Sequence, residues 1–416
     1  MRVMFYFFLT TILLLEGLGI PKGRETAFFF ILIAPFFLFL VGTLHNKKIV
    51  LPTKATLFSV LFLLFSLFSV LHSRDQERSI EQVVYNIALF CIFIFVFNAK
   101  EKMKGYVTFL IYFCSFLFSI YSLVLGSVKG IFPFLIPETG YQFVFSRFGS
   151  HNHLGDFLIL PVCMSLHYLF NKKHIRFSFF SFLFFLPFLI FSFSRSAYST
   201  LIITSIFFVV LSIQHKVQRN RSAIILTISS ILLLTFFFFS TISESRGVVF
   251  ISETHTVLQK ELDLRYKSFI AGRDMFFADG VSALKENMLF GVGPGNYIYI
   301  SGAYSELPQS FTYSSHNIFL DSLTEYGMLA GIAFILFIFS VFLFAEKGLL
   351  ILPLVAMVIN FQTDYTHTIF SYFLLFFVLM GIALKRESVI EKSYMHYVMI
   401  VLSCIPFAYF QYLMFH

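Results

Sequence analysis

The stretch TLFSVLFLLFSLFSVL, residues 56–71, decides the fold class of this chain. It contains no charged residue, and as an α-helix it would extend through most of the roughly 30 Å of hydrocarbon in a lipid bilayer. Apolar runs of the same kind recur at Gly105–Gly126 and Ile224–Ile242. Because only helices and closed barrels satisfy their backbone hydrogen bonds inside a membrane, runs of this length predict an all-α polytopic membrane protein.

The composition of the whole chain supports the same class. Of its 416 residues, 58% are hydrophobic and 20% aromatic, and only 12% are charged. Soluble domains carry about 25% charged residues. Four cysteines, Cys91, Cys114, Cys163 and Cys404, lie within apolar runs without C-x-x-C spacing. We therefore expect buried packing residues at these positions, and neither disulfides nor a zinc site.

Hydropathy predicts about 12 or 13 transmembrane helices. The predicted spans are residues 3–20, 27–44, 55–71, 83–97, 106–126, 154–170, 177–193, 197–213, 222–242, 317–344, 349–362, 368–384 and 395–414. Both counts remain open, because FQTDYTH (361–367) divides one apolar stretch into two short ones.

One connection, residues 243–315, is much longer and more polar than the others. It divides the chain into an N-terminal membrane bundle of about nine spans (1–242), a loop domain (243–315) and C-terminal membrane spans (316–416). Within the loop domain, residues 257–287 place apolar side chains at helical spacing. We expect two amphipathic helices there, between the ninth and tenth spans.

The positive charge of the chain reports its orientation in the membrane. The net charge is +8, and basic residues such as Lys47, Lys100, Lys172 and Lys347 concentrate in alternate loops. By the positive-inside rule, these loops and the N-terminus lie on the cytoplasmic side. The charge therefore reflects topology and implies no nucleic-acid partner. The first apolar run has no A-x-A-like cleavage site and is interpreted as a retained span or signal anchor.

A short polar pattern, S-H-N-x-x-x-D, occurs twice, as SHNHLGD (150–156) and SHNIFLD (315–321). Asn152 and Asn317 are good N-cap residues, with a histidine just outside each helix. Free N–H groups at a helix N-terminus attract anions and favour a neutral imidazole, which can act as a general base. His316 is therefore a candidate catalytic residue. Two simpler readings stay open, namely that the histidines are solvated interface residues and that the repeat is chance.

Two arginines stand where charge is costly. Arg195, in FSRSAYST (193–200), lies between two apolar runs with almost no loop to keep it in water. It needs a cavity or an anionic partner, unless it reaches the head groups by snorkelling. Arg273 opens the second predicted loop helix, with Arg265 and Lys267 a few turns earlier. These side chains could bind phosphate.

Other polar motifs are less informative. Gly291, Gly293 and Gly295 follow no strand, so they are not a dinucleotide fingerprint, and a tight loop is the better interpretation. Asp364 in FQTDYTH is either a structural group or a site residue. The sequence has no D-x-D or H-E-x-x-H motif in its outer segments, so we expect neither a metal nor a cofactor.

Four blocks together resemble the bacterial O-antigen ligase and O-antigen polymerase-related superfamily. They are GSHNHLGDFLIL (149–160), FSRSAYSTLI (193–202), GRDMFFADGVSALKENMLFGVGPGNY (272–297) and SSHNIFLDSLTEYGMLAG (314–331). The likeness covers roughly residues 146–331, and the family's long periplasmic loop between the ninth and tenth spans falls at 243–315. The chain has no tryptophan where relatives often carry one, and Phe276 or Phe277 is expected to stand there.

The resemblance implies a metal-independent, inverting glycosyltransferase of the bacterial inner membrane. Such an enzyme takes a glycan from undecaprenyl diphosphate on the periplasmic face and joins it to an acceptor hydroxyl, with lipid A-core as the leading acceptor. By matching blocks, Arg195 and Arg273 would grip the diphosphate, and His316 would orient or deprotonate the acceptor. Asp364, a looser match, is expected to bind substrate, as are Arg265, Lys267, Asn152 and Asn317.

Three alternatives remain open from the sequence. A polymerase or a protein O-oligosaccharyltransferase would use the same donor with another acceptor. A polysaccharide transporter or flippase would line a pathway with Arg195, Asp364 and the broken late spans. That hypothesis predicts polar residues throughout the bilayer, whereas the polar clusters gather at the outer ends of the spans. A purely structural membrane protein is the third alternative.

Overall fold

The computed structural model describes nine segments and a few further positions of the chain. The segments are 2–17, 50–128, 151–171, 173–192, 194–214, 273–304, 312–346, 350–385 and 389–391; the further positions are 227–228, 230–232, 235, 401–402, 404–406 and 408–409. The predicted spans 27–44, 222–242 and 395–414 lie wholly or mostly outside these residues, as do Arg265 and Lys267.

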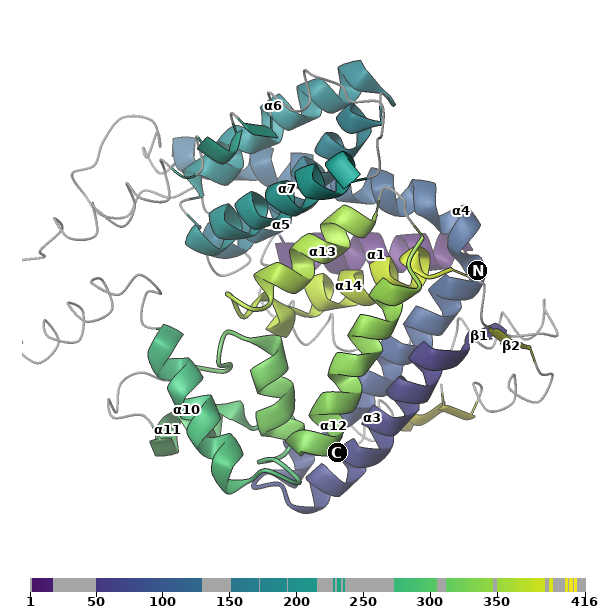
Figure 1. Ribbon diagram of the computed structural model, residues 1–416, viewed down its shortest axis with the longest axis vertical. Helices are drawn as coiled ribbons and strands as arrows, with labels where there is room; N and C mark the ends of the chain where they lie inside the picture. Colours follow the sequence, from purple (N-terminus) through teal and green to yellow (C-terminus); the bar gives the residue numbers. More distant parts are fainter. Residues whose placement is uncertain are drawn as a thin grey trace, which may run out of the picture.

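The described residues form an all-α membrane protein, as predicted (Figure 1). Five helical segments are long and apolar enough to span a bilayer: Thr53–Leu71, Gln76–Ala99, Met103–Val124, Asn152–Phe170 and Ile318–Leu343. The helices are α1 (Arg2–Gly17), α3 (Thr53–Leu71), α4 (Gln76–Val128), α5 (His151–Phe170), α6 (Ile175–Phe191), α7 (Arg195–Gln214), α10 (Arg273–Glu286), α11 (Tyr297–Tyr304), α12 (Ile318–Leu343), α13 (Ile351–Asn360) and α14 (Phe370–Ala383). Only β1 (Val50–Pro52) and β2 (Val389–Glu391) form strands, in one antiparallel pair, among the described residues.

Helix α4 joins the predicted spans 83–97 and 106–126, between which we expect a loop. It is continuous from Gln76 to Val128, so the expected connection at 98–105 is helical. The connecting residues, NAKEKMKG, are mostly strong helix formers, and this local preference explains the error. Figure 1 shows α4 change direction near its middle, so that its two halves still act as separate spans.

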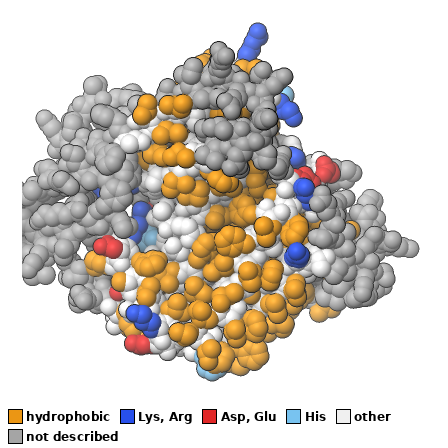
Figure 2. All heavy atoms as spheres, in the orientation of Figure 1, with side chains coloured by type: hydrophobic (Ala, Val, Ile, Leu, Met, Phe, Trp, Pro, Cys, Tyr) orange, Lys and Arg blue, Asp and Glu red, His pale blue; other side chains and the backbone are white. Residues whose placement is uncertain are grey.

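Helix α3 shows how a span sorts its residues between lipid and protein. Leu57, Leu64, Leu67 and Leu71 recur at helical spacing on its exposed face. Figure 2 shows hydrophobic side chains gathered over α3 and α12, as expected for a surface that contacts lipid. The opposite face buries Ala55, Ser59, Phe62, Ser66 and Ser69. Its small residues let α12 approach closely, as in other membrane helix pairs.

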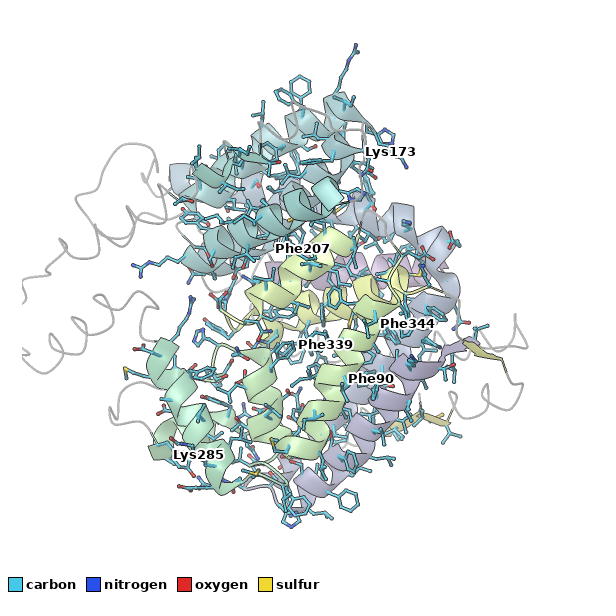
Figure 3. The ribbon with its side chains drawn as sticks, in the orientation of Figure 1. Phe90, Lys173, Phe207, Lys285, Phe339 and Phe344 are labelled. Atoms are coloured by element: carbon cyan, nitrogen blue, oxygen red, sulfur yellow. The ribbon has the colours of Figure 1, made fainter. Side chains whose placement is uncertain are left out.

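Helix α14 forms the centre of the described bundle. Every residue from Ser371 to Ala383 is buried. Its Phe377 ring meets Phe90 of α4 edge to face at a centroid separation of 5.3 Å and stacks on Phe337 of α12 at 6.0 Å. The Phe90 ring in turn contacts the Phe337 ring of α12 at a centroid separation of 4.9 Å; Phe90 is labelled in Figure 3. Aromatic packing of this kind uses the many phenylalanines of the chain to fix three helices relative to one another.

Helix α12 does not run straight through the membrane as the predicted span 317–344 requires. Its backbone breaks at Gly327, where φ is 81° and ψ is 170°, a conformation that only glycine adopts readily. A Cβ on Gly331 would lie 2.8 Å from the Leu323 Cα, although residues eight apart in a straight helix are separated by about 12 Å. The chain therefore makes a helical hairpin with a short first arm (318–326) and a longer second arm (328–343), as Figure 1 also shows.

A glycine-rich loop, residues 287–296, holds the turn of this hairpin. The Met328 N–H donates to the Met288 carbonyl at 2.8 Å, and the Val292 N–H donates to the Thr324 carbonyl at 3.0 Å. Gly291, Gly293 and Gly295 all have positive φ, which confirms the expected tight loop. The loop packs against Gly327 and against Ser73, between α3 and α4. We call this end of the bundle the α3–α4 end.

The opposite end of the bundle carries β1 and β2. The Lys385 N–H donates to the Phe344 carbonyl at 2.9 Å, and the Lys54 ammonium lies 4.6 Å from the centre of the Phe344 ring. The second arm of α12 therefore begins at the α3–α4 end and finishes beside basic residues. Cys91, Cys114 and Cys163 are buried and free, and Cys404 is half-buried and free, in agreement with the packing role expected for them.

Candidate functional site

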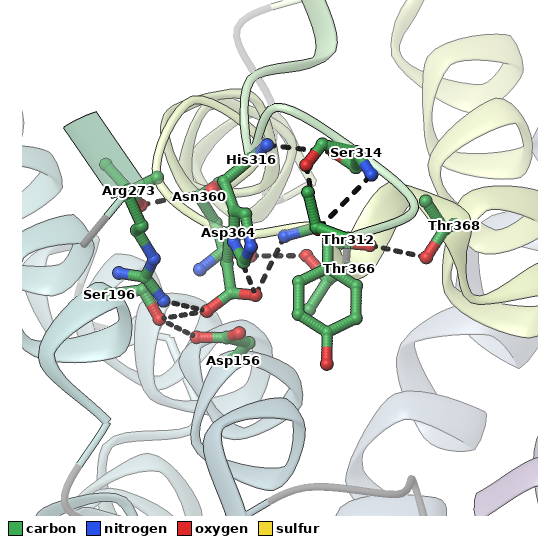
Figure 4. A network of polar contacts seen from close by, with 12 residues as sticks. Asp156, Ser196, Arg273, Thr312, Ser314, His316, Asn360, Asp364, Thr366 and Thr368 are labelled. Carbon is green, nitrogen blue, oxygen red and sulfur yellow. Dashed lines mark hydrogen bonds and ion pairs between the residues drawn. The ribbon is translucent and has the colours of Figure 1, made fainter. Parts of the chain in front are cut away.

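The centre of the candidate site is an ion pair between two residues far apart in the sequence. The guanidinium Nη2 of Arg273, the first residue of α10, lies 2.6 Å from Asp364 Oδ2 (Figure 4). Asp364 is fully buried between α13 and α14, and 16% of the Arg273 side chain is exposed. The structure thus brings together a residue of the long loop and a residue of the late spans, both selected from the sequence.

Contacts with the first arm of α12 place Arg273 at this position. Tyr297, fully buried behind α10, donates from its hydroxyl to the Phe276 carbonyl at 2.5 Å. Thr324 Oγ1 donates to the Gly280 carbonyl at 3.3 Å, and a side chain at Gly280 would crowd Leu320. Gly280 therefore permits the close approach that directs the start of α10 toward Asp364.

His316 lies beside the same carboxylate. Its Nδ1 is 3.9 Å from Asp364 Oδ1, and 11% of its side chain is exposed. The ring stacks on Phe276 at a centroid separation of 5.3 Å and meets Tyr365 edge to face at 4.8 Å. Phe276, rather than Phe277, is thus the phenylalanine of this helix that contacts the site. Arg273 and His316 share one carboxylate from two sides.

The surroundings set the charges of Arg273, His316 and Asp364. Burial lowers the pKa of His316 to about 4; the Asp364 charge raises it and the Arg273 charge lowers it further. Burial raises the pKa of the Asp364 carboxyl, but Arg273, His153 and His316 outweigh it and hold that pKa below its usual value. Near neutral pH the site therefore presents a cation, a carboxylate and a neutral imidazole. Such a set can bind an anion and accept a proton.

Asp321 fixes the loop that carries His316. Its Oδ1 accepts a hydrogen bond from the Ser315 N–H at 2.7 Å, and its Oδ2 accepts one from the Ser314 hydroxyl. The Nε2 of His367 lies 2.8 Å from the same Oδ2. The Ser314 hydroxyl oxygen accepts from the His316 N–H at 2.9 Å. His316 has φ of 61°, so these bonds hold a backbone conformation that a non-glycine residue rarely adopts.

A second aspartate, Asp156 on α5, lies beside Asp364. The Ser196 hydroxyl is 2.9 Å from Asp156 Oδ1 and 3.1 Å from Asp364 Oδ2, so it bridges the two carboxyl groups. A side chain at Gly155 would collide with Ser192 and Ser194, and the glycine therefore lets the α6–α7 turn approach α5. Through this turn, α5 and α7 close the site on the side away from α12.

The other predicted site residues take different positions. Arg195 is the first residue of α7, and its side chain is half-buried. The next residue, Ser196, contacts Asp364. Asn317 is the N-cap of α12, where its Oδ1 accepts from Phe319 N–H at 3.1 Å and Leu320 N–H at 2.9 Å. Asn152 is no N-cap, because α5 already begins at His151. The first arm of α12, which Asn317 caps, ends at Gly327.

Asp156 and Asp321 are site residues that are not among those predicted from the sequence. A signal for them was present, because they are the last residues of the two S-H-N-x-x-x-D segments. In both segments the aspartate is buried and accepts hydrogen bonds from serines. Local N-cap reasoning assigned a role to the asparagine and histidine of the pattern, and none to the aspartate one helical turn later.

Part of the chain is similar to a known protein family. Residues 180–335 match the family described as O-antigen ligase, and this range contains Arg195, Arg273 and His316. No curated protein matches the chain. Proteins of the matched family are glycosyltransferase-like enzymes in general. Residues 180–335 of the chain are therefore similar to the O-antigen ligase family.

Proposed function

We propose that this protein is a glycosyltransferase of the O-antigen ligase type. It would transfer a glycan from undecaprenyl diphosphate to an acceptor hydroxyl, with lipid A-core as the leading acceptor, at the periplasmic face of the bacterial inner membrane. The observation that supports the proposal best is the Arg273–Asp364–His316 arrangement, in which a cation and a neutral imidazole share one carboxylate. The reaction needs those two functions together.

The proposed transfer is a single inverting displacement. The acceptor oxygen forms a bond to the anomeric carbon while the bond from that carbon to the diphosphate oxygen breaks, and the electron pair leaves with the diphosphate. Arg273 stabilises the charge that develops on the leaving group, because one of its five N–H groups contacts Asp364 and others can bind phosphate oxygens. Arg195, Arg265 and Lys267 are proposed to bind the same diphosphate, so that protein cations serve in place of a metal.

His316 is proposed to take the proton of the acceptor hydroxyl. Its pKa of about 4 keeps the ring neutral and able to accept a proton near pH 7. Nδ1 is the nitrogen near Asp364, which leaves Nε2 to face the acceptor. The imidazolium that forms lies beside the Asp364 carboxylate, which stabilises its charge as the aspartate of a catalytic triad does. Asp364 therefore assists both the cation and the base.

Reconstituted transfer tests the proposal. The purified protein is mixed with glycan-linked undecaprenyl diphosphate and lipid A-core, and the products are separated by size. We expect transfer by the wild type and a decrease of about 10²- to 10³-fold in Arg273→Gln, the range found for loss of one transition-state donor. The matched control is Lys285→Gln, at the other end of the same helix (Figure 3), which should retain full activity.

The nature of the product separates the remaining alternatives. Glycan attached to lipid A-core supports a ligase, whereas a lengthened donor would identify a polymerase and a modified protein a protein O-oligosaccharyltransferase. Movement of the intact donor across liposomes without any transfer would instead identify a flippase and contradict the enzymatic proposal. Equal activity of Arg273→Gln and Lys285→Gln would also contradict it, because the leaving group would then not need Arg273.

A further inference from the structure

A cavity of about 120 Å³ lies between α3, α4, α14 and the first arm of α12. Tyr313, Ile318 and Asp321 contribute to its wall. His316, in the same segment, contacts Asp364, Phe276 and Tyr365 instead. The loop that carries His316 therefore separates this cavity from the Arg273–Asp364 pair. The cavity is large enough for about eight water molecules, or for a small polar ligand that displaces them.

The chemistry of the wall is that of a sugar-binding site. Hydrogen-bonding groups come from Gln82 and Asn86 on α4 and from Asp321 and Glu325, one turn apart on α12, and the apolar walls are aromatic rings. His367 also lines the cavity; 9% of its side chain is exposed, and its Nδ1 has no hydrogen-bond partner among the described residues. Amides and carboxylates bind ring hydroxyls, and aromatic faces cover the C–H faces of a sugar.

The charge of the cavity wall does not favour the diphosphate of the lipid-linked donor. Two carboxyl groups, Asp321 and Glu325, face the cavity together with a single arginine, Arg78. The wall therefore has no excess of positive charge to hold a diphosphate, whereas its hydrogen-bonding groups can hold a neutral sugar. The cation needed for a diphosphate lies on the other side of the His316 loop, at Arg273.

The cavity is accessible from the α3–α4 end. Tyr313, 59% exposed, lines it together with Gly295 of the glycine-rich loop. Phe62 and Phe334 line it deeper, on spans α3 and α12. A glycan arriving from the side of the long loop would therefore meet the polar groups first and reach an aromatic floor.

We propose that this cavity binds a sugar residue of the acceptor glycan, next to the residue whose hydroxyl reacts. The inference rests on the proposed function, because an inverting displacement puts the attacking hydroxyl and the leaving diphosphate on opposite faces of the anomeric carbon. With the diphosphate at Arg273, the acceptor approaches from the other side of His316, where the cavity lies. The donor and acceptor thus have separate sites divided by the base.

The absence of tryptophan from the chain allows a direct binding test. Tyr313→Trp places a single indole at the cavity, and Tyr299→Trp, on the exposed face of α11, is the matched control. The probes are the oligosaccharide released from lipid A-core by mild acid and inorganic pyrophosphate. We expect the oligosaccharide to quench the indole fluorescence of Tyr313→Trp and not that of Tyr299→Trp. Pyrophosphate should quench neither variant. Quenching of Tyr313→Trp by pyrophosphate alone, or by neither probe, would overturn the inference.

Kinetics supply a second and independent measurement. Gln82→Ala should raise the KM for lipid A-core about tenfold, the effect of one lost hydrogen bond, and leave the KM for the lipid donor unchanged. Gln76→Ala, exposed at the start of α4, should change neither constant. An unchanged acceptor KM in Gln82→Ala would overturn the inference while leaving the proposed function intact. If the wild type transfers nothing, the proposed function fails, and the fluorescence titration still decides whether the cavity binds sugar.

Discussion

The segments SHNHLGD (150–156) and SHNIFLD (315–321) follow the same pattern and build different structures. The first opens α5, which continues without reversal to Phe170. The second opens the first arm of α12, which ends after nine residues at Gly327, where the chain turns back. In both segments the final aspartate is buried near the candidate site. The comparison shows that the polar start of a helix can be read locally, whereas its continuation depends on a distant partner.

The two aspartates also differ in what they hold. Asp156 contacts the α6–α7 turn through Ser196, whereas Asp321 fixes the loop of His316 through Ser314 and Ser315. Asp156 therefore closes the site from the side of α5, and Asp321 positions the proposed base, His316.

Of the changes we propose, removal of the turn at Gly327 should have the largest effect on the difference between α5 and α12. A Cβ in Gly327→Ala would collide with the Leu289 carbonyl, in a backbone conformation that alanine does not adopt. We expect a destabilisation of at least about 3 kcal/mol and loss of most folded protein, measured by thermal unfolding and size-exclusion chromatography in detergent. Gly105→Ala is the control, because open space surrounds Gly105 within α4. Equal stability of the two variants would show that the hairpin is not formed.

The next largest effect concerns the histidine of the second segment. His316→Gln should lower the transfer rate by about 10²- to 10⁴-fold, the usual contribution of a general base. Since burial lowers the pKa of His316 to about 4, the imidazole is neutral above that pH. Titration of His316 should therefore leave the wild-type transfer rate constant from pH 8 to about pH 5. The rate should fall only below about pH 5, where the imidazole becomes protonated. An inflection near pH 6.5 in the pH–rate profile would contradict the assignment.

The same group links folding to pH. An unfolded histidine titrates near 6.5, so between about pH 6.5 and 4 the unfolded chain binds a proton that buried His316 does not. This contribution to stability is fully present above pH 6.5 and is lost as the pH falls toward 4. His316→Gln should remove that part of the pH dependence of the unfolding temperature.

Asp321→Asn should have an intermediate effect. The amide retains one acceptor oxygen where the carboxylate now serves Ser314, Ser315 and His367. We expect about a tenfold lower transfer rate at saturating concentrations of both substrates, because His316 is no longer held in place. Ser314→Ala, which removes one bond of this set, should have a smaller effect. A normal rate in Asp321→Asn would show that the loop does not need the carboxylate.

Asp156→Asn should have the smallest effect. The amide oxygen can still accept from Ser196, and the substitution places no charge beside Asp364. We expect the transfer rate to change by less than about threefold. Asp364→Asn, which removes the partner of Arg273, should by contrast lower the rate by at least about 10²-fold. If both variants are equally impaired, the two carboxyl groups act as one unit.

Most of the membrane architecture can be predicted from local sequence. The lengths of apolar runs predict α3, α5, α6 and α7 with shifts of a few residues at their ends. Two features cannot be found this way. The continuity of α4 depends on residues 98–105 that favour a helix although their charges suggest a loop. The reversal of α12 depends on Gly327, which looks like an ordinary small residue of a membrane helix until its contact with Leu289 is known.

The candidate site was predictable in its members more than in its geometry. The sequence predicts Arg273, His316 and Asp364 as site residues, and the structure brings them into contact. Asp321 was not selected, because its role depends on Ser314, Ser315 and His367 meeting in space. The cavity was not foreseen either, since it lies between four elements whose packing no single segment specifies.

The hairpin of α12 has a consequence for how the protein is made. During membrane insertion, residues 318–343 have the length and hydropathy of one complete span. Their first arm acquires its partners, Gly280 and the loop 287–296, only from the segment that precedes it outside the span. We therefore expect the reversal at Gly327 to follow insertion, once the segment that supplies these partners has folded. His316 would then move into place late, and an incompletely assembled protein in the membrane would lack the Arg273–Asp364–His316 arrangement.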